Sequence, residues 1–240
     1  MFASPNFGER RGGLRPSLVV IHYTAMESCA AARHRLCDPA AEVSAHWLIS
    51  ETGDMDQLVD EPLRAWHAGA GTWAGLGDVN SRSIGIELAN RGTHPFPEPQ
   101  MAALEALLRG VLSRWGIAPQ GVIAHSDMAP GRKTDPGLRF DWQRLARGGL
   151  SVWPDPSAGW MAGDAALADP GPAPSQAVLR DSFAACARAF GYPDVDPDLV
   201  LAAFRLRFRP WASGPVDVRD LAMADCLARR HPPQDACAAH

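Results

Sequence analysis

Two histidines and one aspartate, far apart in the chain, are the side chains best suited to hold a catalytic metal ion. His22 follows the apolar residues 18–21, a run that predicts a buried strand with an imidazole at its end. His125 and Asp135 open and close the segment His-Ser-Asp-Met-Ala-Pro-Gly-Arg-Lys-Thr-Asp. Two imidazoles and one carboxylate are the ligand count of an open catalytic zinc site, whose fourth position is left for water. The alternative for Asp135 is a residue that caps a turn before Pro136.

Two further charged residues are candidates for the proton transfer and charge stabilisation that a metal-assisted hydrolysis requires. Glu87 lies in the otherwise apolar run of residues 84–88, where burial would raise its pKa toward that of a general acid or base. The alternative is a glutamate that faces solvent from an edge strand. Lys133 precedes Asp135 by two residues, so an extended chain would place its ammonium near the metal and a developing oxyanion. The alternative is a solvated surface lysine.

The elements that must position these residues mix strand and helix patterns. Ser28 is expected to cap a helix that continues to Leu36, and Pro99 to open a helix that ends at Gly116. This mixture predicts an α/β fold with a mixed central β-sheet flanked by helices. Strands are predicted at residues 18–22, 44–50, 56–59, 83–89 and 122–124, with a hairpin turn at 51–54.

The composition changes in the last third of the chain. Five prolines within residues 154–174 indicate a linker. Beyond it, helical spacing of apolar residues predicts three short helices, with stops or caps at Gly191, Asp196 and Asp217. We therefore expect a catalytic domain over residues 1–153 and a small three-helix domain over residues 175–240.

The segments that carry the candidate ligands resemble the zinc-dependent N-acetylmuramoyl-L-alanine amidases of the amidase-2 type, which share their fold with peptidoglycan recognition proteins. The resemblance spans roughly residues 5–155. It extends loosely over residues 175–230 to a small peptidoglycan-binding-like domain found in some members. It implies that a Zn²⁺ ion is held by His22, His125 and Asp135.

The resemblance also implies an activity and its residues. Members hydrolyse the amide bond between N-acetylmuramic acid, or its 1,6-anhydro form, and L-alanine in bacterial cell-wall degradation and muropeptide recycling. Glu87 and Lys133 match the catalytic positions of the family, Glu87 beside the metal-bound water. The division of work between the two residues stays open.

Four more residues match family segments that contact substrate. Trp66 and His67 resemble the rim that meets the sugar and the first peptide residues, although tryptophans also fill cores. Asn80 and Arg82 precede the predicted Glu87 strand and are expected to bind peptide carboxylates, with Arg82 the better anion partner. His46 is interpreted as a structural histidine.

Charge and hydropathy exclude several partners. The net charge is −4 without a long basic run, which gives no electrostatic support for a nucleic-acid partner. No apolar run approaches the roughly 18 residues that span a bilayer. Residues 1–13 lack the pattern of a secretory signal. We expect a cytoplasmic monomer that acts on muropeptide or peptidoglycan.

Two other functions compete with this hypothesis. A non-catalytic peptidoglycan recognition module would keep the fold and lose a metal ligand, whereas this chain carries all the candidate ligands. A zinc peptidase is disfavoured because the chain has no His-Glu-x-x-His sequence. The three-helix domain could bind soluble fragments, shape the cleft, or bind nothing.

Overall fold

The computed structural model describes residues 2–155 and 174–233, so that nearly all of the predicted linker over residues 154–174 lies outside the described residues. The centre is a five-stranded sheet in the order β4-β3-β6-β2-β7. Its strands are β2 (Leu18–Tyr23), β3 (Trp47–Ile49), β4 (Met55–Gln57), β6 (Ser83–Leu88) and β7 (Val122–Ala124).

Four of these strands run parallel, and β4 pairs with β3 in the antiparallel direction. This arrangement confirms the predicted α/β class with a mixed sheet. Two short segments, β1 (Phe7–Gly8) and β5 (Arg64–Ala65), form a separate antiparallel pair.

Two of the capping residues that the sequence offers bound helices in the structure. Ser28 accepts a hydrogen bond from the amide of Ala31, and Gly116 closes its helix with a φ of 65°. The helices are α1 (Cys29–Leu36), α2 (Val79–Arg82), α3 (Glu98–Trp115), α4 (His125–Met128), α5 (Trp142–Arg147), α6 (Gln176–Phe190), α7 (Pro197–Phe208) and α8 (Val218–Arg230). Three short 3₁₀ turns lie at Arg11–Gly13, Pro39–Ala41 and Pro119–Gly121.

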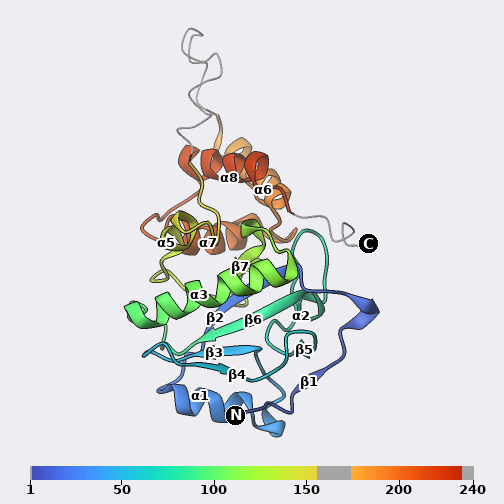
Figure 1. The fold of residues 1–240 in the computed structure, drawn as a ribbon. Helices are drawn as coiled ribbons and strands as arrows, with labels where there is room; N and C mark the ends of the chain where they lie inside the picture. The colour runs from blue at the N-terminus through green and yellow to red at the C-terminus, as the bar shows by residue number, and fades with distance from the viewer. Residues whose placement is uncertain (1, 156–173, 234–240) are drawn as a thin grey trace.

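The two faces of the sheet have different roles. Val19 and Ile21 of β2 join Ile84 and Ile86 of β6 in the cluster that packs under α3, and Figure 1 shows this helix crossing the sheet. Because successive strand side chains alternate between faces, the remaining residues of these strands point to the opposite face. Among them are His22 and Glu87, which are direct partners in the parallel register of β2 and β6.

The three C-terminal helices lie beyond β7, whereas α1 lies at the opposite end of the sheet (Figure 1). Their apolar side chains, including Phe204 and Phe208, belong to one cluster with Val20 of β2 and Met128 of α4. The predicted three helices are thus present, and they share a hydrophobic core with the sheet. The domain boundaries themselves remain predictions.

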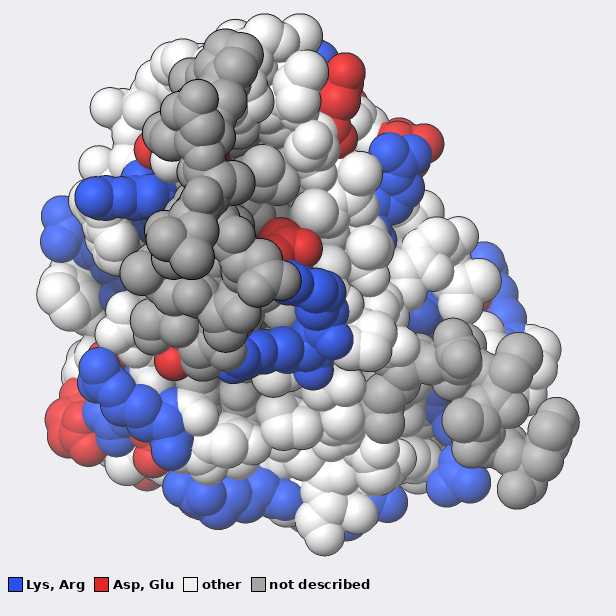
Figure 2. Space-filling model, turned by 90° about the horizontal axis from the view of Figure 1, so that it is seen from above, with Lys and Arg blue, Asp and Glu red and all other residues white. Residues whose placement is uncertain are grey.

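The surface gives limited information on partners. Figure 2 shows clusters of Lys and Arg interspersed with Asp, Glu and broad uncharged surface on the face that it displays. Within residues 2–155 and 174–233, no helix has the length and hydropathy needed to cross a bilayer.

Candidate metal centre and catalytic cleft

The structure brings the three predicted ligands together at the carboxyl ends of parallel strands. His22 lies in β2, His125 starts α4 directly after β7, and Asp135 lies in the following loop. The Nδ1 atoms of the two histidines are 2.9 Å apart, and each lies 2.9–3.0 Å from Oδ2 of Asp135. All three residues are at least 93% buried, so their polar atoms face one another rather than bulk water.

The partner of His125 fixes its tautomer. Nε2 of His125 lies 2.9 Å from the carbonyl oxygen of Ala68. A carbonyl only accepts hydrogen bonds, so Nε2 carries the proton and donates it. The neutral ring therefore presents a lone pair at Nδ1, the atom that faces Asp135.

A chain of hydrogen bonds fixes the tautomer of His22 in the same way. The Ser83 hydroxyl donates to the carbonyl of Val79 at 2.6 Å and so accepts from Nε2 of His67 at 3.1 Å. Nδ1 of neutral His67 is then bare and accepts from Nε2 of His22 at 3.0 Å. Burial lowers the pKa of His67 well below its ordinary value, which keeps this ring neutral. His22 is left with a lone pair at Nδ1.

This donor set fits a divalent transition metal. Two imidazole lone pairs and a carboxylate oxygen converge, and the ligand atoms of the three residues lie within 4.8 Å of one another. Burial and the neighbouring His125 lower the pKa of His22 to about 4. Electron-rich atoms this close together repel one another unless a cation lies between them, and partners on the far ring nitrogens are typical of zinc sites.

Glu87 has the environment of a proton carrier. Burial and the nearby carboxylate of Asp135 raise the pKa of Glu87 to about 8, while the charge of Lys133 opposes the shift. Oε2 of Glu87 is buried and has no hydrogen-bond partner among the described residues. A carboxyl group with this pKa can hold or release a proton near neutral pH.

These residues line one cleft of about 560 Å³. Lys133 and Glu87 both border it, together with apolar and aromatic side chains from Tyr23, Met26 and Trp66. The cleft thus joins the three candidate metal ligands, a carboxyl group with a raised pKa and an ammonium to a surface that suits a glycopeptide.

Comparison with known proteins agrees with this geometry. The family model described as N-acetylmuramoyl-L-alanine amidase matches residues 12–138, more than half of the chain. The chain belongs to this amidase family. N-acetylmuramoyl-L-alanine amidase AmiD of Escherichia coli is 36% identical over 243 residues, which cover 90% of this chain and 84% of AmiD.

Solved amidase structures share the fold over nearly the whole chain. AmiD from E. coli, in complex with anhydro-N-acetylmuramic acid-L-Ala-D-gamma-Glu-L-Lys, superposes with a TM-score of 0.77 and 32% identity, covering 95% of this chain and 99% of AmiD. AmpDh3 from Pseudomonas aeruginosa, in complex with anhydromuramic pentapeptide, gives 0.74 and 30% identity, covering 97% and 96% of the two chains.

Against this amidase framework, two of the predicted substrate residues do not reach the cleft. The side-chain oxygen of Asn80 accepts from the amides of His67 and Ala68 at 3.0 and 2.8 Å. Arg82 is 4% exposed and donates to the carbonyl of Leu76 at 2.9 Å. Asn80 thus holds the backbone of residues 67–68, and Arg82 holds the loop carbonyls of Trp73 and Leu76. Contrary to the expectation, neither side chain is presented to a peptide carboxylate in the cleft.

The other predicted residues of this amidase lie at or under the cleft. Trp66 borders the cleft, as the resemblance implies. His67 also borders it, but both of its ring nitrogens are engaged, with His22 and Ser83. His46 is a buried structural histidine, whose Nδ1 accepts from the amide of Gly85 at 2.9 Å.

Sequence reasoning missed two arginines of the amidase cleft. Arg35, near the end of α1, borders the cleft and is exposed. Arg132 donates to the carbonyl of Ala68 at 2.7 Å, the same oxygen that accepts from His125. The signal for Arg35 was the Ser28-capped helix, whose last turn is basic. No local pattern signals that Arg132 turns toward a loop more than 60 positions earlier.

Proposed function

We propose that this protein is a zinc-dependent amidase that hydrolyses the bond between N-acetylmuramic acid, or its 1,6-anhydro form, and L-alanine. The observation that carries the proposal is the convergence of His22, His125 and Asp135 on one point of a cleft. Glu87 and Lys133 border the same cleft and supply the remaining groups that amide hydrolysis requires.

Zinc bound by these three side chains would supply a Lewis acid for the amide carbonyl and for water. Glu87 would hold a proton and deliver it to the nitrogen of the departing L-alanine, because an amine leaves readily only when protonated. The ammonium of Lys133 would stabilise the negative charge that develops on the carbonyl oxygen. The roles of both residues are part of the proposal.

The chemistry of the cleft supports a muropeptide as substrate. Trp66 and Tyr23 offer aromatic faces to the sugar and lactyl groups, and Arg35 offers a cation to a carboxylate of the stem peptide. The complexes of AmiD and AmpDh3 hold anhydromuramyl peptides. We therefore propose the anhydro form as the preferred substrate of this chain.

The deciding experiment is mass spectrometry of defined muropeptides after incubation with zinc-loaded protein. We expect the free stem peptide to appear, and to appear faster from the anhydro form than from the reducing form. Release of no peptide by protein that holds one equivalent of zinc would contradict the proposed activity. It would favour the competing hypothesis of a recognition module.

The metal content of Asp135→Ala tests the ligand set directly. Loss of one of three ligands should leave the variant without zinc under conditions in which the wild type retains one equivalent. Asp141→Ala is the matched control, because Asp141 caps α5 through the amide of Arg144 and does not border the cleft. Equal zinc in wild type and Asp135→Ala would mean that the metal binds elsewhere.

The cytoplasmic location, the monomeric state and the absence of nucleic-acid and membrane partners remain predictions.

A further inference from the structure

A buried carboxylate links the metal-binding group to the C-terminal helices. Asp127 is fully buried in α4, two residues after His125. Its Oδ2 accepts from the amide of Ala124, the residue that immediately precedes His125, at 2.9 Å. This bond ties the backbone on the amino-terminal side of the proposed ligand to the carboxylate.

The same short helix is connected to a second proposed ligand. The amide of Ser126 donates to the carbonyl of Asp135 at 3.0 Å, and the amide of Ala129 donates to the carbonyl of His125 at 3.1 Å. A displacement of α4 would therefore move His125 and Asp135 relative to His22, which is held separately in β2.

Two residues from the helical segment hold Asp127 in place. The hydroxyl of Tyr192, which follows α6, donates to Oδ1 of Asp127 at 2.7 Å. Arg207 of α7 forms a salt bridge with Oδ2 of Asp127, and the side chains of both residues are fully buried. Arg207 also donates to the carbonyl of Val122 in β7 and to the hydroxyl of Ser151, each at 3.1 Å.

Arg207 also packs against two aromatic rings. Its guanidinium lies 4.2 Å from the ring centre of Trp142 in α5 and 4.8 Å from that of Phe208. A buried carboxylate that loses its cation is strongly destabilised, so the position of Asp127 depends on residues 65 and 80 positions further along the chain.

We propose that Tyr192 and Arg207 are positioning residues of the metal centre, which act through Asp127 on the placement of His125. The inference rests on the proposed zinc amidase function. On this view the C-terminal helices complete the catalytic unit, whether or not they also bind glycan.

The chain contains a matched control for this arrangement. Asp220 is fully buried in α8, accepts from the amide of Asp217 three residues earlier at 3.0 Å, and pairs with Arg205 and Arg209. It repeats the geometry of Asp127 within the helical segment, and these partners all lie between Arg205 and Asp217. A purely structural role predicts similar consequences at both sites.

The experiment compares Asp127→Asn and Tyr192→Phe with Asp220→Asn in the full chain. Zinc affinity is measured by competition with a chromogenic chelator, and the visible spectrum of the Co²⁺-loaded proteins reports the geometry of the ligands. We expect Asp127→Asn and Tyr192→Phe to weaken zinc binding by about 10- to 100-fold, the usual effect of losing a residue behind the ligands, and to shift the Co²⁺ bands. Tyr192→Phe removes the hydroxyl that binds Asp127 and keeps the buried ring, so we expect this variant to fold even if Asp127→Asn does not.

Asp220→Asn should lower the melting temperature and leave the zinc affinity and the Co²⁺ spectrum unchanged. Wild-type zinc affinity in both Asp127→Asn and Tyr192→Phe would overturn the inference. So would an equal loss of affinity in Asp220→Asn. These outcomes leave the proposed function intact as long as the wild type binds zinc and releases stem peptide.

Discussion

At the scale of single residues, the protonation states in the cleft are set by neighbours. His22 and His125 are each held in the tautomer that has a lone pair at Nδ1. The ring of His67 holds His22, and the backbone carbonyl of Ala68 holds His125. Glu87, in contrast, has a pKa raised to about 8, and its Oε2 atom meets no hydrogen-bond partner within residues 2–155 and 174–233. The two imidazoles are therefore suited to bind a cation, and the carboxyl group is suited to exchange a proton.

Glu87→Gln tests this assignment, because the amide has nearly the same shape and cannot exchange a proton. We expect kcat to fall by about 10²- to 10⁴-fold, with zinc content and KM little changed. In the wild type, activity should decline as pH rises through the pKa of Glu87, since the general acid is then lost. A bound cation favours the carboxylate form of Glu87 and lowers its pKa, so this decline in activity should occur below pH 8 in the zinc-loaded enzyme.

The measurement is the pH profile of kcat and kcat/KM for wild type and variant. The variant should not show the decline in activity at rising pH that is expected of the wild type. Glu61→Gln serves as control, because Glu61 is a buried glutamate that binds Trp47, Arg114 and Trp115 away from the cleft. Its loss should lower stability without changing kcat. An unchanged kcat in Glu87→Gln would remove Glu87 from the reaction.

At the scale of elements, strand alternation places the site. On β6, Ile84 and Ile86 pack under α3, while Gly85 and Glu87 face the opposite side. The ring of His67 lies directly against Gly85, where a β-carbon would come within 2.4 Å of the ring. The absence of a side chain at Gly85 therefore makes room for the imidazole that holds His22.

Gly85→Ala should displace the His67 ring and, through it, His22. We expect a loss of about 1–3 kcal/mol in the free energy of unfolding from overpacking. Zinc affinity should fall by about 10-fold or more. Gly8→Ala is the control, because Gly8 lies in strand β1 with open space around its α-carbon. Denaturant unfolding and chelator competition report the two effects, and wild-type zinc affinity in Gly85→Ala would argue against the role of His67.

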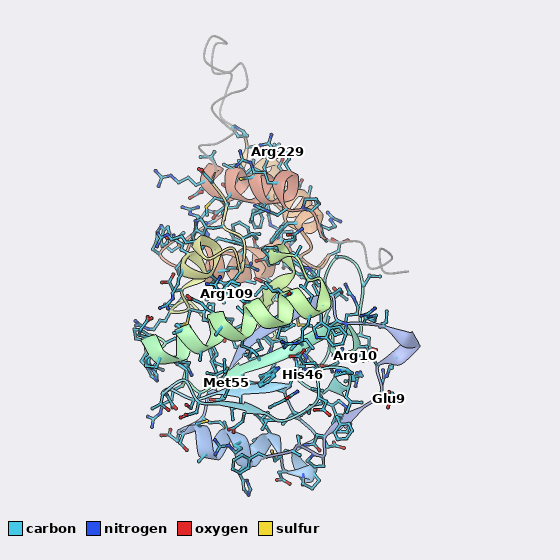
Figure 3. All side chains as sticks on the ribbon, viewed as in Figure 1. Glu9, Arg10, His46, Met55, Arg109 and Arg229 are labelled. Carbon is cyan, nitrogen blue, oxygen red and sulfur yellow. The ribbon has the colours of Figure 1, made fainter. Side chains whose placement is uncertain are left out.

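At the scale of the whole molecule, several buried histidines make the fold sensitive to acid. Nη2 of Arg10 lies 3.2 Å from Nε2 of His46, and Figure 3 labels these two neighbouring side chains. Burial lowers the pKa of His46 to about 3, against about 6.5 for histidine in an unfolded chain. The unfolded state thus binds this proton more readily, and the free energy of unfolding falls as pH drops from about 6.5 to about 3.

His46→Asn should reduce this dependence, because the amide keeps an acceptor for the Gly85 amide and does not titrate. We expect the metal-free variant to be less stable than wild type at pH 7, and to lose less stability between pH 6.5 and 4. Urea unfolding in the presence of a chelator, at a series of pH values, measures both quantities. His34→Asn, on the exposed surface of α1, is the control. Equal slopes for wild type and His46→Asn would contradict the prediction.

Local sequence patterns were sufficient for much of the fold and for the identity of the proposed ligands. The strand before His22 and the helix between Pro99 and Gly116 were predictable from the spacing of apolar residues and from capping residues. Both signals depend only on neighbours in the chain. The family resemblance then implied that His22, His125 and Asp135 bind one metal ion, and the structure places their ligand atoms within 4.8 Å of one another.

Only the tertiary structure decided what each polar side chain contacts. Arg82 resembled an anion-binding residue in sequence and proves to hold backbone carbonyls, whereas Arg35 borders the cleft. The dependence of α4 on Tyr192 and Arg207 spans 65 and 80 positions of sequence. A hydrogen bond depends on distance and direction in space, and spacing along the chain does not specify these once the partners lie in different elements.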